Sequence, residues 1–364
     1  MNSKVFNSYF LLLFSFIPAS IIIGPAVSLI NILLIDFFFI FLIFYKKDYK
    51  FLSNKVVKLI IFLCLYLIFN SIISKDFLMS ANRNFGFIRF GILFLAFNYF
   101  FYNKDFVNRV LIVWMLTLSI LSLDTYIESI FDKNILGYGE AYGSRIVSFF
   151  KDEPIVGGYI NGFYLIIIGY LFYIKKNTTN KYKYIILVIS IIFIIAIILT
   201  GERSNSIKAI SGFFLFYFFN DFFKFKEKIF SILLLILLFT FLLNSSDFLK
   251  TRYVGQFLKP VISTFKLNNK IQKNEIKVNT FKNNIYLRLY QSGFEVFKEY
   301  PIFGVGNKNY RVETCLKEKN PNYICTTHPH QLYFEFLAEH GLFGSVVLFF
   351  ILFNLIFGRI KIIL

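Results

Sequence analysis

The sequence YIILVISIIFIIAIILT, residues 184–200, holds a lone serine and no charged side chain between its first tyrosine and its last threonine. A helix needs about 20 mostly apolar residues to cross the ~30 Å hydrocarbon core of a membrane, and a run of about 18 or more with few charges is a candidate span. Similar blocks recur along most of the chain, whose residues are 57% hydrophobic. This pattern predicts an all-α, polytopic transmembrane protein.

We expect about ten such spans. They lie at residues 8–23, 26–44, 56–74, 86–102, 107–130, 155–174, 184–200, 204–220, 229–244 and 331–357. Three regions follow from this arrangement. Residues 1–244 hold every span but the last, residues 245–330 form a large and partly helical periplasmic loop region, and residues 331–364 hold the C-terminal span and a cytoplasmic tail.

Lysine and arginine predict the orientation, because the cytoplasmic loops of membrane proteins carry an excess of them. They gather in one set of alternate loops, at residues 46–58, 104–109, 175–183, 224–228 and 359–361. We therefore expect a multi-pass protein of the bacterial inner membrane with both termini in the cytoplasm. These loops explain much of the formal net charge of +18, which therefore does not indicate a nucleic-acid partner.

The periplasmic loop region contains one segment that is expected to be helical and one candidate disulfide. The apolar residues of Asn284–Tyr300 fit an amphipathic helix, and Pro301 ends it. Cys315 and Cys325 lie close together in the same region. In an oxidising periplasm they can form a disulfide worth a little under ~3 kcal/mol, although two unpaired thiols are the alternative.

Soluble enzyme motifs are missing, so the candidate site is a set of polar residues on the periplasmic side. The first group is the turn Gly201–Ser206, GERSNS, between two apolar spans. Arg203 there can bind an anionic substrate, since its planar fork suits phosphate oxygens. The N-terminus of the helix that follows adds a positive dipole. The alternative is an arginine that reaches to lipid phosphates.

Two further groups lie in the periplasmic loop region. Arg288 is a second candidate cation, although a solvated arginine on an amphipathic helix is the more common outcome. Thr327–Gln331, with His328 and His330, directly precedes the last span. A histidine in this place can act as a general base near neutral pH. The alternative is a capping or structural histidine, and a metal site is not expected because no third ligand is evident.

Three stretches in this order resemble the O-antigen ligase and O-antigen polymerase superfamily. They are GERSNS at 201–206, RLYQSGFEVFKEYPIFGVG at 288–306 and HPHQLYFEFLAEHGLFG at 328–344. The segment Ser144–Pro154, which contains Arg145, also resembles a loop found in some members. The chain departs from the family at Gln331, where asparagine is usual. Members commonly have two more helices after the last matched span, so this chain is expected to be a truncated or minimal member.

The resemblance implies transfer of a glycan from an undecaprenyl-diphosphate carrier on the periplasmic face, without a metal ion or another cofactor. The acceptor is lipid A core for a ligase and a second carrier-linked glycan for a polymerase. Arg203 and Arg288 are then expected to neutralise the diphosphate and His330 to deprotonate the acceptor hydroxyl. Supporting roles would fall to Glu202, Arg145 and His328.

Two other functions are consistent with a polytopic helical protein. The main alternative is a flippase for lipid-linked oligosaccharides, and Asp36 and Asp124 are the chief acids inside spans that a transporter could use. Transporters commonly show internal repeats with a site near the midplane, and no repeat is visible here. We therefore expect the two acids to serve helix packing. A structural component of an assembly is the third alternative.

Overall fold

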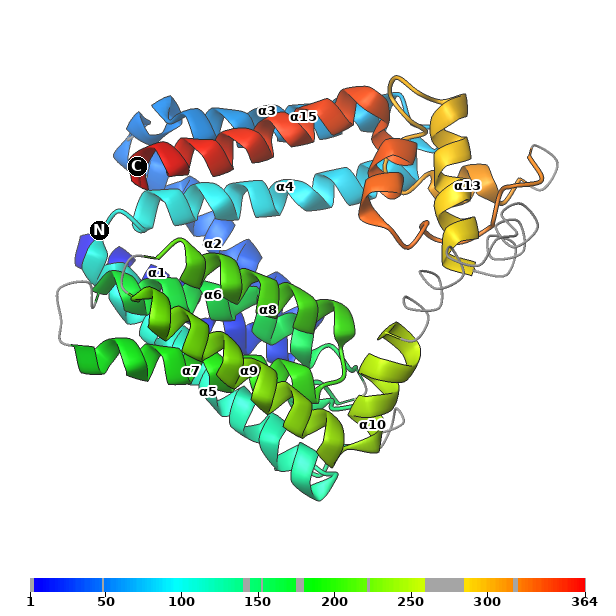
Figure 1. The fold of residues 1–364 in the computed structure, drawn as a ribbon. Coiled ribbons are helices and arrows are strands. Elements are labelled where there is room, and N and C mark those ends of the chain that lie inside the picture. The colour runs from blue at the N-terminus through cyan, green and yellow to red at the C-terminus, as the bar shows by residue number, and fades with distance from the viewer. Residues whose placement is uncertain are drawn as a thin grey trace. The chain divides into compact units, whose positions relative to one another are not determined.

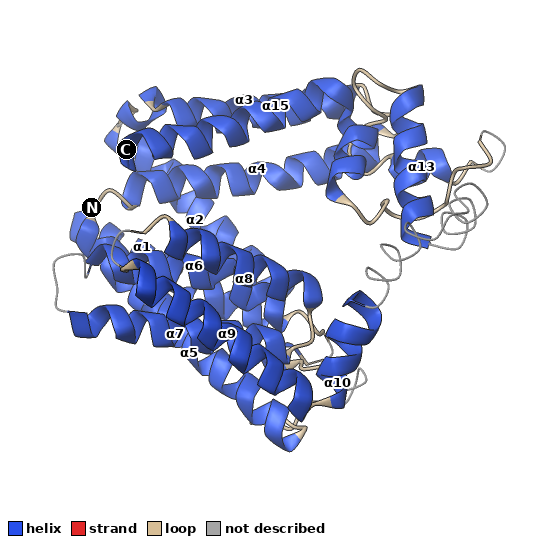
Figure 2. Ribbon diagram, in the orientation of Figure 1, coloured by secondary structure: helices blue, strands red, loops and turns tan. Residues whose placement is uncertain are grey.

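The computed structural model describes residues 3–47, 49–139, 145–151, 153–174, 180–220, 223–258, 285–316 and 320–363. Every regular element among these residues is a helix, as Figure 2 shows. Eight of the described helices are long and apolar enough to cross a membrane. The expected class, an all-α polytopic membrane protein, is confirmed.

Two of the expected spans correspond to helices that do not meet these criteria of length and composition. Helix α8 (Arg203–Phe218) has only 16 residues and includes Lys208. Helix α4 (Phe77–Phe100) is longer but carries Arg83 and Arg89 among several asparagines, which lower its hydropathy. Both segments are helical as expected, while eight spans rather than ten are supported by length and apolar composition.

The described residues form two compact units, the first of which comprises those within 1–31 and 103–258. Within it, α1 packs against α5, while α6 contacts α5, α7 and α8. The short helix α10 follows α9 and leads into a π-helix, η3. The bounds are α1 Ser3–Ile23, α5 Lys104–Phe131, η2 Ser148–Phe150, α6 Val156–Ile174, α7 Asn180–Leu199, α9 Phe225–Ser245, α10 Asp247–Lys250 and η3 Thr251–Leu258.

A proline inside α1 leaves one backbone carbonyl without its helical hydrogen bond, and a side chain of α5 replaces that bond. Pro18 has no N–H, so the carbonyl of Phe14, four residues earlier, lacks its usual helical donor. The indole N–H of Trp114 on α5 donates to that carbonyl at 2.9 Å. Because an unpaired carbonyl in hydrocarbon costs several kcal/mol, this bond replaces the missing backbone donor and joins α1 to α5.

The second unit comprises the described residues within 32–102 and 285–363. Helix α3 packs against both α4 and α15, and α13 packs against α15 (Figure 1). Helix α2 begins in the first unit and continues in the second. The remaining bounds are α2 Pro25–Lys46, η1 Lys50–Ser53, α3 Lys55–Ile72, α13 Ile285–Glu299, α14 Tyr310–Thr314 and α15 Leu332–Ile363. The expected amphipathic helix before Pro301 is therefore confirmed.

Helix α15 is interrupted at Gly341, whose φ of 61° and ψ of −163° are not helical. The loop after α13 lies against the break and bonds to the freed backbone groups. The amides of Leu342 and Phe343 donate to the carbonyls of Pro301 (2.8 Å) and Ile302 (3.0 Å). The amides of Val305 and Gly306 donate to the carbonyls of Ala338 (3.0 Å) and Glu339 (2.9 Å). Both ends of the break are thus satisfied by loop 301–306.

Two glycines make this contact possible. A Cβ on Gly341 would lie 2.5 Å from the carbonyl carbon of Ile302, and one on Gly304 would lie 2.4 Å from the carbonyl carbon of Glu339. Gly304 also has a positive φ of 71°. The sequence FGVG before α14 and HGLFG within α15 therefore encode one backbone-to-backbone contact.

Replacing Gly341 by alanine should destabilise the protein by about 2 kcal/mol or more, because the new Cβ meets backbone and the left-handed φ disfavours alanine. Thermal unfolding of the purified protein in detergent measures the effect. Gly86→Ala is the matched control, since a Cβ on this α4 residue meets only the end of the Arg89 side chain, at 3.9 Å. Equal melting temperatures for the two variants would show that the contact at Gly341 does not limit stability.

Candidate functional site

The turn between α7 and α8 carries two of the candidate residues, Glu202 and Arg203. Gly201 has a φ of 70°, which lets the chain reverse directly before α8 begins. The Glu202 carboxylate lies at the N-terminus of α6, where its oxygens accept the amides of Gly157 (2.7 Å) and Gly158 (3.1 Å). The side chain of Asn205 also donates to it, at 2.5 Å. Glu202 therefore fixes the turn to α6 through that helix's unpaired amides.

The two glycines at the start of α6 allow the carboxylate to come this close. A Cβ on Gly157 would lie 2.6 Å from the Thr200 hydroxyl, and one on Gly158 would lie 3.1 Å from the Asn205 amide nitrogen. Arg203 follows this turn directly and is the first residue of α8. Its Nη1 donates to the carbonyl of Gln256 in η3 at 2.9 Å.

Arg145 lies in the same unit, on the segment that follows α5. Two acids of α5 hold the residues that come after it. Glu128 accepts the amides of Val147 (2.9 Å) and Ser148 (2.6 Å), and Asp124 accepts the Ser148 hydroxyl (2.5 Å). Asp124 was expected to serve helix packing, and it instead binds the loop that carries Arg145. The reason is that polar groups of the irregular chain after α5, here the Ile135 amide and the Ser148 hydroxyl, need acceptors.

Arg145 lines a cavity of about 700 Å³ together with residues of α5, α9 and α10. Apolar side chains such as Leu199, Leu242 and Phe248 form part of its wall, and Glu128 and Asp132 are polar members. The cavity thus combines an apolar wall with charged side chains of both signs, the guanidinium of Arg145 and the two acids.

In the second unit, His330 adopts an unusual backbone conformation. Its φ is 57°, which is strained for a residue other than glycine, and its side chain is exposed. The rings of His328 and His330 lie 4.3 Å apart between centroids. Nδ1 of His328 is 2.9 Å from the hydroxyl of Thr327, and the rings of His330 and Tyr286 of α13 are nearly perpendicular, with their centroids 6.3 Å apart. The turn therefore presents an exposed imidazole with a second imidazole beside it.

Helix α13 and the start of α15 fix this turn. A Cβ on Gly293 of α13 would lie 3.1 Å from Pro329 and 3.1 Å from Phe334, so the glycine allows close packing. Gln331 accepts the amide of Phe334 through its side chain at 2.9 Å. This bond is a capping contact of the kind that asparagine commonly makes at the start of a helix, so Gln331 caps α15.

The candidate residues fall into two sets. Arg288 is exposed on α13 and belongs with His328 and His330 in the second unit. Arg145, Glu202 and Arg203 belong to the first. The convergence of Arg203 with Arg288 and His330 around one cavity stays a prediction. The sequence analysis did not identify Arg252 and Gln256 of η3 as candidates. The signal in the sequence was a pair of polar residues four positions apart, shortly after the span that α9 forms.

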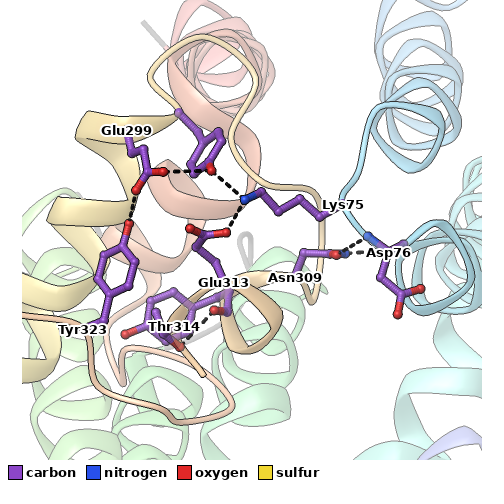
Figure 3. Close-up of polar contacts among 9 residues, drawn as sticks. Lys75, Asp76, Glu299, Asn309, Glu313, Thr314 and Tyr323 are labelled. Atoms are coloured by element: carbon purple, nitrogen blue, oxygen red, sulfur yellow. Dashed lines mark hydrogen bonds and ion pairs between the residues drawn. The ribbon is translucent and has the colours of Figure 1, made fainter. Parts of the chain in front are cut away.

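A network of charged and phenolic groups holds α14 and its loop to the turn between α3 and α4 (Figure 3). Lys75 binds the fully buried carboxylate of Glu313 and donates to the Tyr300 hydroxyl at 2.5 Å. The hydroxyls of Tyr300 and Tyr323 both donate to Glu299, at 2.9 and 2.5 Å. Partial burial alone lowers the pKa of Lys75, but its bonds to Glu313 and Tyr300 raise it above the ordinary value.

A disulfide joins Cys315 and Cys325, whose Cα atoms are 4.4 Å apart. It links the residue directly after α14 to Cys325. This part of the chain is therefore held covalently by the disulfide and also by the ion pair of Glu313 with Lys75. Among the residues that the structure describes, no group of three histidine, cysteine, aspartate or glutamate side chains could hold a metal ion.

Comparison with known proteins found one family. A family model described as O-antigen ligase matches residues 157–349, which is more than half of the chain. The matched range contains Arg203, Arg288 and His330 as well as the break of helix α15 at Gly341. No curated protein and no solved structure matched the chain.

Replacing Lys75 by methionine should destabilise the protein by about 3 kcal/mol or more, because the buried Glu313 carboxylate loses its cation. Since the pKa of Lys75 is raised, its contribution is fully present at neutral pH and is lost only as pH rises through that raised value. Thermal unfolding at neutral pH is the measurement.

Lys298→Met is the control for this variant. Lys298 pairs with Glu295 at 3.0 Å, but its side chain is 55% exposed, so the change should be within about 0.5 kcal/mol. A similar loss of stability in both variants would contradict the importance assigned to the buried pair.

Proposed function

The chain belongs to the O-antigen ligase family, and we propose that it transfers a glycan from an undecaprenyl-diphosphate carrier to an acceptor on the periplasmic face of the inner membrane. Family membership makes the protein a multi-pass membrane enzyme of O-antigen ligase type. The observation that carries the finer proposal is that two arginines and an exposed, strained histidine, Arg203, Arg288 and His330, all lie within the matched residues.

In the proposed reaction, the imidazole of His330 takes the proton of the acceptor hydroxyl. The hydroxyl oxygen then attacks the anomeric carbon of the donor glycan and forms the new glycosidic bond. The bond between that carbon and the diphosphate oxygen breaks, and undecaprenyl diphosphate leaves with the electron pair. Attack from the side opposite the leaving group inverts the anomeric configuration, and the proton stays on His330 until it is released to solvent.

Arginine is well suited to the charge that develops on the leaving group. A guanidinium binds two phosphate oxygens at once and stays charged at any physiological pH. Arg203 and Arg288 are proposed to neutralise the diphosphate, so that the reaction proceeds without a metal ion. Glu202 and the acids that hold the Arg145 loop act as positioning residues, and His328 supports His330 through the ring contact between them.

His330→Ala should lower glycan transfer by about 10²- to 10⁴-fold, because a general base contributes a factor of this size. Surface polysaccharide of cells that depend on this protein, analysed for glycan length and attachment, is the measurement. Loss of attachment to lipid A core indicates a ligase, whereas loss of chain length indicates a polymerase.

Arg203→Lys should also be impaired, because it keeps the charge but loses the two-pronged geometry. The exposed Lys208 on the same helix supplies the control, as Lys208→Arg should leave transfer unchanged. All variants need equal amounts of protein in the membrane. Normal polysaccharide in the His330 variant would refute the assignment of the base, and carrier-linked units accumulating on the cytoplasmic face would favour a flippase.

Arg203 and His330 should come within about 15 Å of each other when donor is bound, since both must reach one leaving group and its acceptor. Cysteines beside the two positions, at the exposed Ser204 and Thr327, leave both residues in place and, in a Cys64→Ala background, should then be joined by a bifunctional reagent of that span. The single-cysteine variants are the controls. Consistent failure to cross-link with donor present would separate the two residues and end the shared-site proposal.

A further inference from the structure

The π-helix η3 is held firmly against the turn that carries Arg203. Tyr253 is buried, and its hydroxyl donates to the carbonyl of Ile198 at 3.1 Å and lies 2.6 Å from the Ser206 hydroxyl. Its ring packs edge-on against Phe239 of α9 at 5.5 Å. π-Helical turns are rare and are often found at functional sites. The neighbouring side chains of η3 are therefore held in place.

Arg252 is the neighbour of interest. Its Nε donates to the carbonyl of Gly201 at 3.2 Å, and its Nη1 donates to the side-chain oxygen of Gln256 at 2.9 Å. The backbone carbonyl of the same glutamine accepts Nη1 of Arg203. The guanidinium groups of Arg203 and Arg252 therefore both bind Gln256, and Arg252 also binds Gly201 in the turn before Arg203.

A third arginine, Arg145, contributes positive charge near Arg252. Burial lowers the pKa of Arg252, and the positive charges of Arg145 and Arg203 lower it further. None of the three arginines takes part in the ion pairs found among the described residues. The carboxylate of Glu202, which directly precedes Arg203, is already bound by amides of α6. Like charges gathered in this way repel, and an anion between them removes the repulsion.

A cavity adjoins this cluster at Arg145, and its lining also contains Glu128, whose carboxylate is bound by the amides of Val147 and Ser148, and Asp132. Arg145 lines it, and so do Phe248 and Leu249, which precede Arg252 by one turn. Leu199 and Leu242 extend the apolar part of the wall. A volume of about 700 Å³ holds a diphosphate together with a short length of hydrocarbon.

We propose that Arg252 completes a phosphate-binding cluster with Arg145 and Arg203, and that this cluster holds the diphosphate of a polyprenyl-linked donor while the cavity takes the first isoprenoid units. The inference rests on the proposed function, because it names the ligand of the same transfer reaction. Arg252 contacts the ligand here, and Gln256 positions the two guanidinium groups that bind it.

Binding of undecaprenyl diphosphate to the full chain in phosphatidylcholine nanodiscs tests the proposal. Arg252→Gln should weaken binding by about tenfold or more, because a hydrogen bond to a charged group is lost. Arg252→Lys should weaken it less, since charge remains. The matched control is Lys250→Gln, which removes an exposed cation from the preceding helix and should leave binding unchanged. Thermal unfolding identifies any variant that fails to fold.

Each outcome decides the proposal. Unchanged affinity in the folded Arg252 variants would overturn it, and if Arg252→Gln does not fold, Arg252→Lys alone decides. A second arm uses nanodiscs that contain phosphatidylglycerol and no diphosphate carrier. If the variants lose binding of that lipid but keep binding of undecaprenyl diphosphate, the cluster recognises a phospholipid headgroup and the donor assignment is wrong.

The assay measures binding without transfer, so it separates this inference from the proposed function. His330→Ala should bind undecaprenyl diphosphate as the unaltered protein does. If that variant loses transfer while the Arg252 variants bind normally, the proposed function stands and only the cluster is lost. If the cluster binds as expected while His330→Ala transfers glycan normally, the assignment of the base has failed instead.

Discussion

Backbone groups inside a membrane must find partners within the protein, and this requirement determines how the candidate site is built. Helix α15 breaks at Gly341, and the loop that follows α13 supplies both donors and acceptors to the two sides of the break. The loop cannot move away without breaking the four backbone hydrogen bonds described above. Because the same helix begins at Leu332, two residues after His330, fixing the helix also restricts the position of the proposed base.

An ion pair, a disulfide and a close helix contact hold the chain on either side of this loop. Lys75 and the buried Glu313 hold α14 to the turn between α3 and α4, and the Cys315–Cys325 disulfide closes the chain beyond α14. Gly293 lets α13 pack directly against the turn that carries His330. An exposed imidazole with a left-handed backbone therefore lies on a rigid support, which is what a positioned general base requires.

The sequence allowed the helical spans and the amphipathic helix before Pro301 to be predicted, because apolar blocks of the right length and a proline at their end act locally. The break at Gly341 was not predicted. It depends on a contact between segments 301–306 and 338–343, and nothing in HGLFG alone indicates which backbone will approach the glycine.

The partners of Asp124 could not be predicted either, because they are a loop amide and a loop hydroxyl rather than a neighbouring helix. Arg203 was recognisable as a cation in a turn, but its neighbour Arg252 was not, because its bond to Gly201, 51 residues earlier in the sequence, forms only when η3 folds back.

The acids of the first unit explain why its arginines are left to bind an anion. Irregular segments between spans expose amides that need acceptors, and Glu128 and Glu202 accept two backbone amides each. Two amides fix each of these carboxylates in position, and neither forms an ion pair with an arginine among the described residues. The positive charge of Arg203 and Arg252 is therefore uncompensated next to a cavity with an apolar wall. An amphiphilic anion satisfies both features at once, since its charged group meets the guanidinium groups while its hydrocarbon replaces water on the wall.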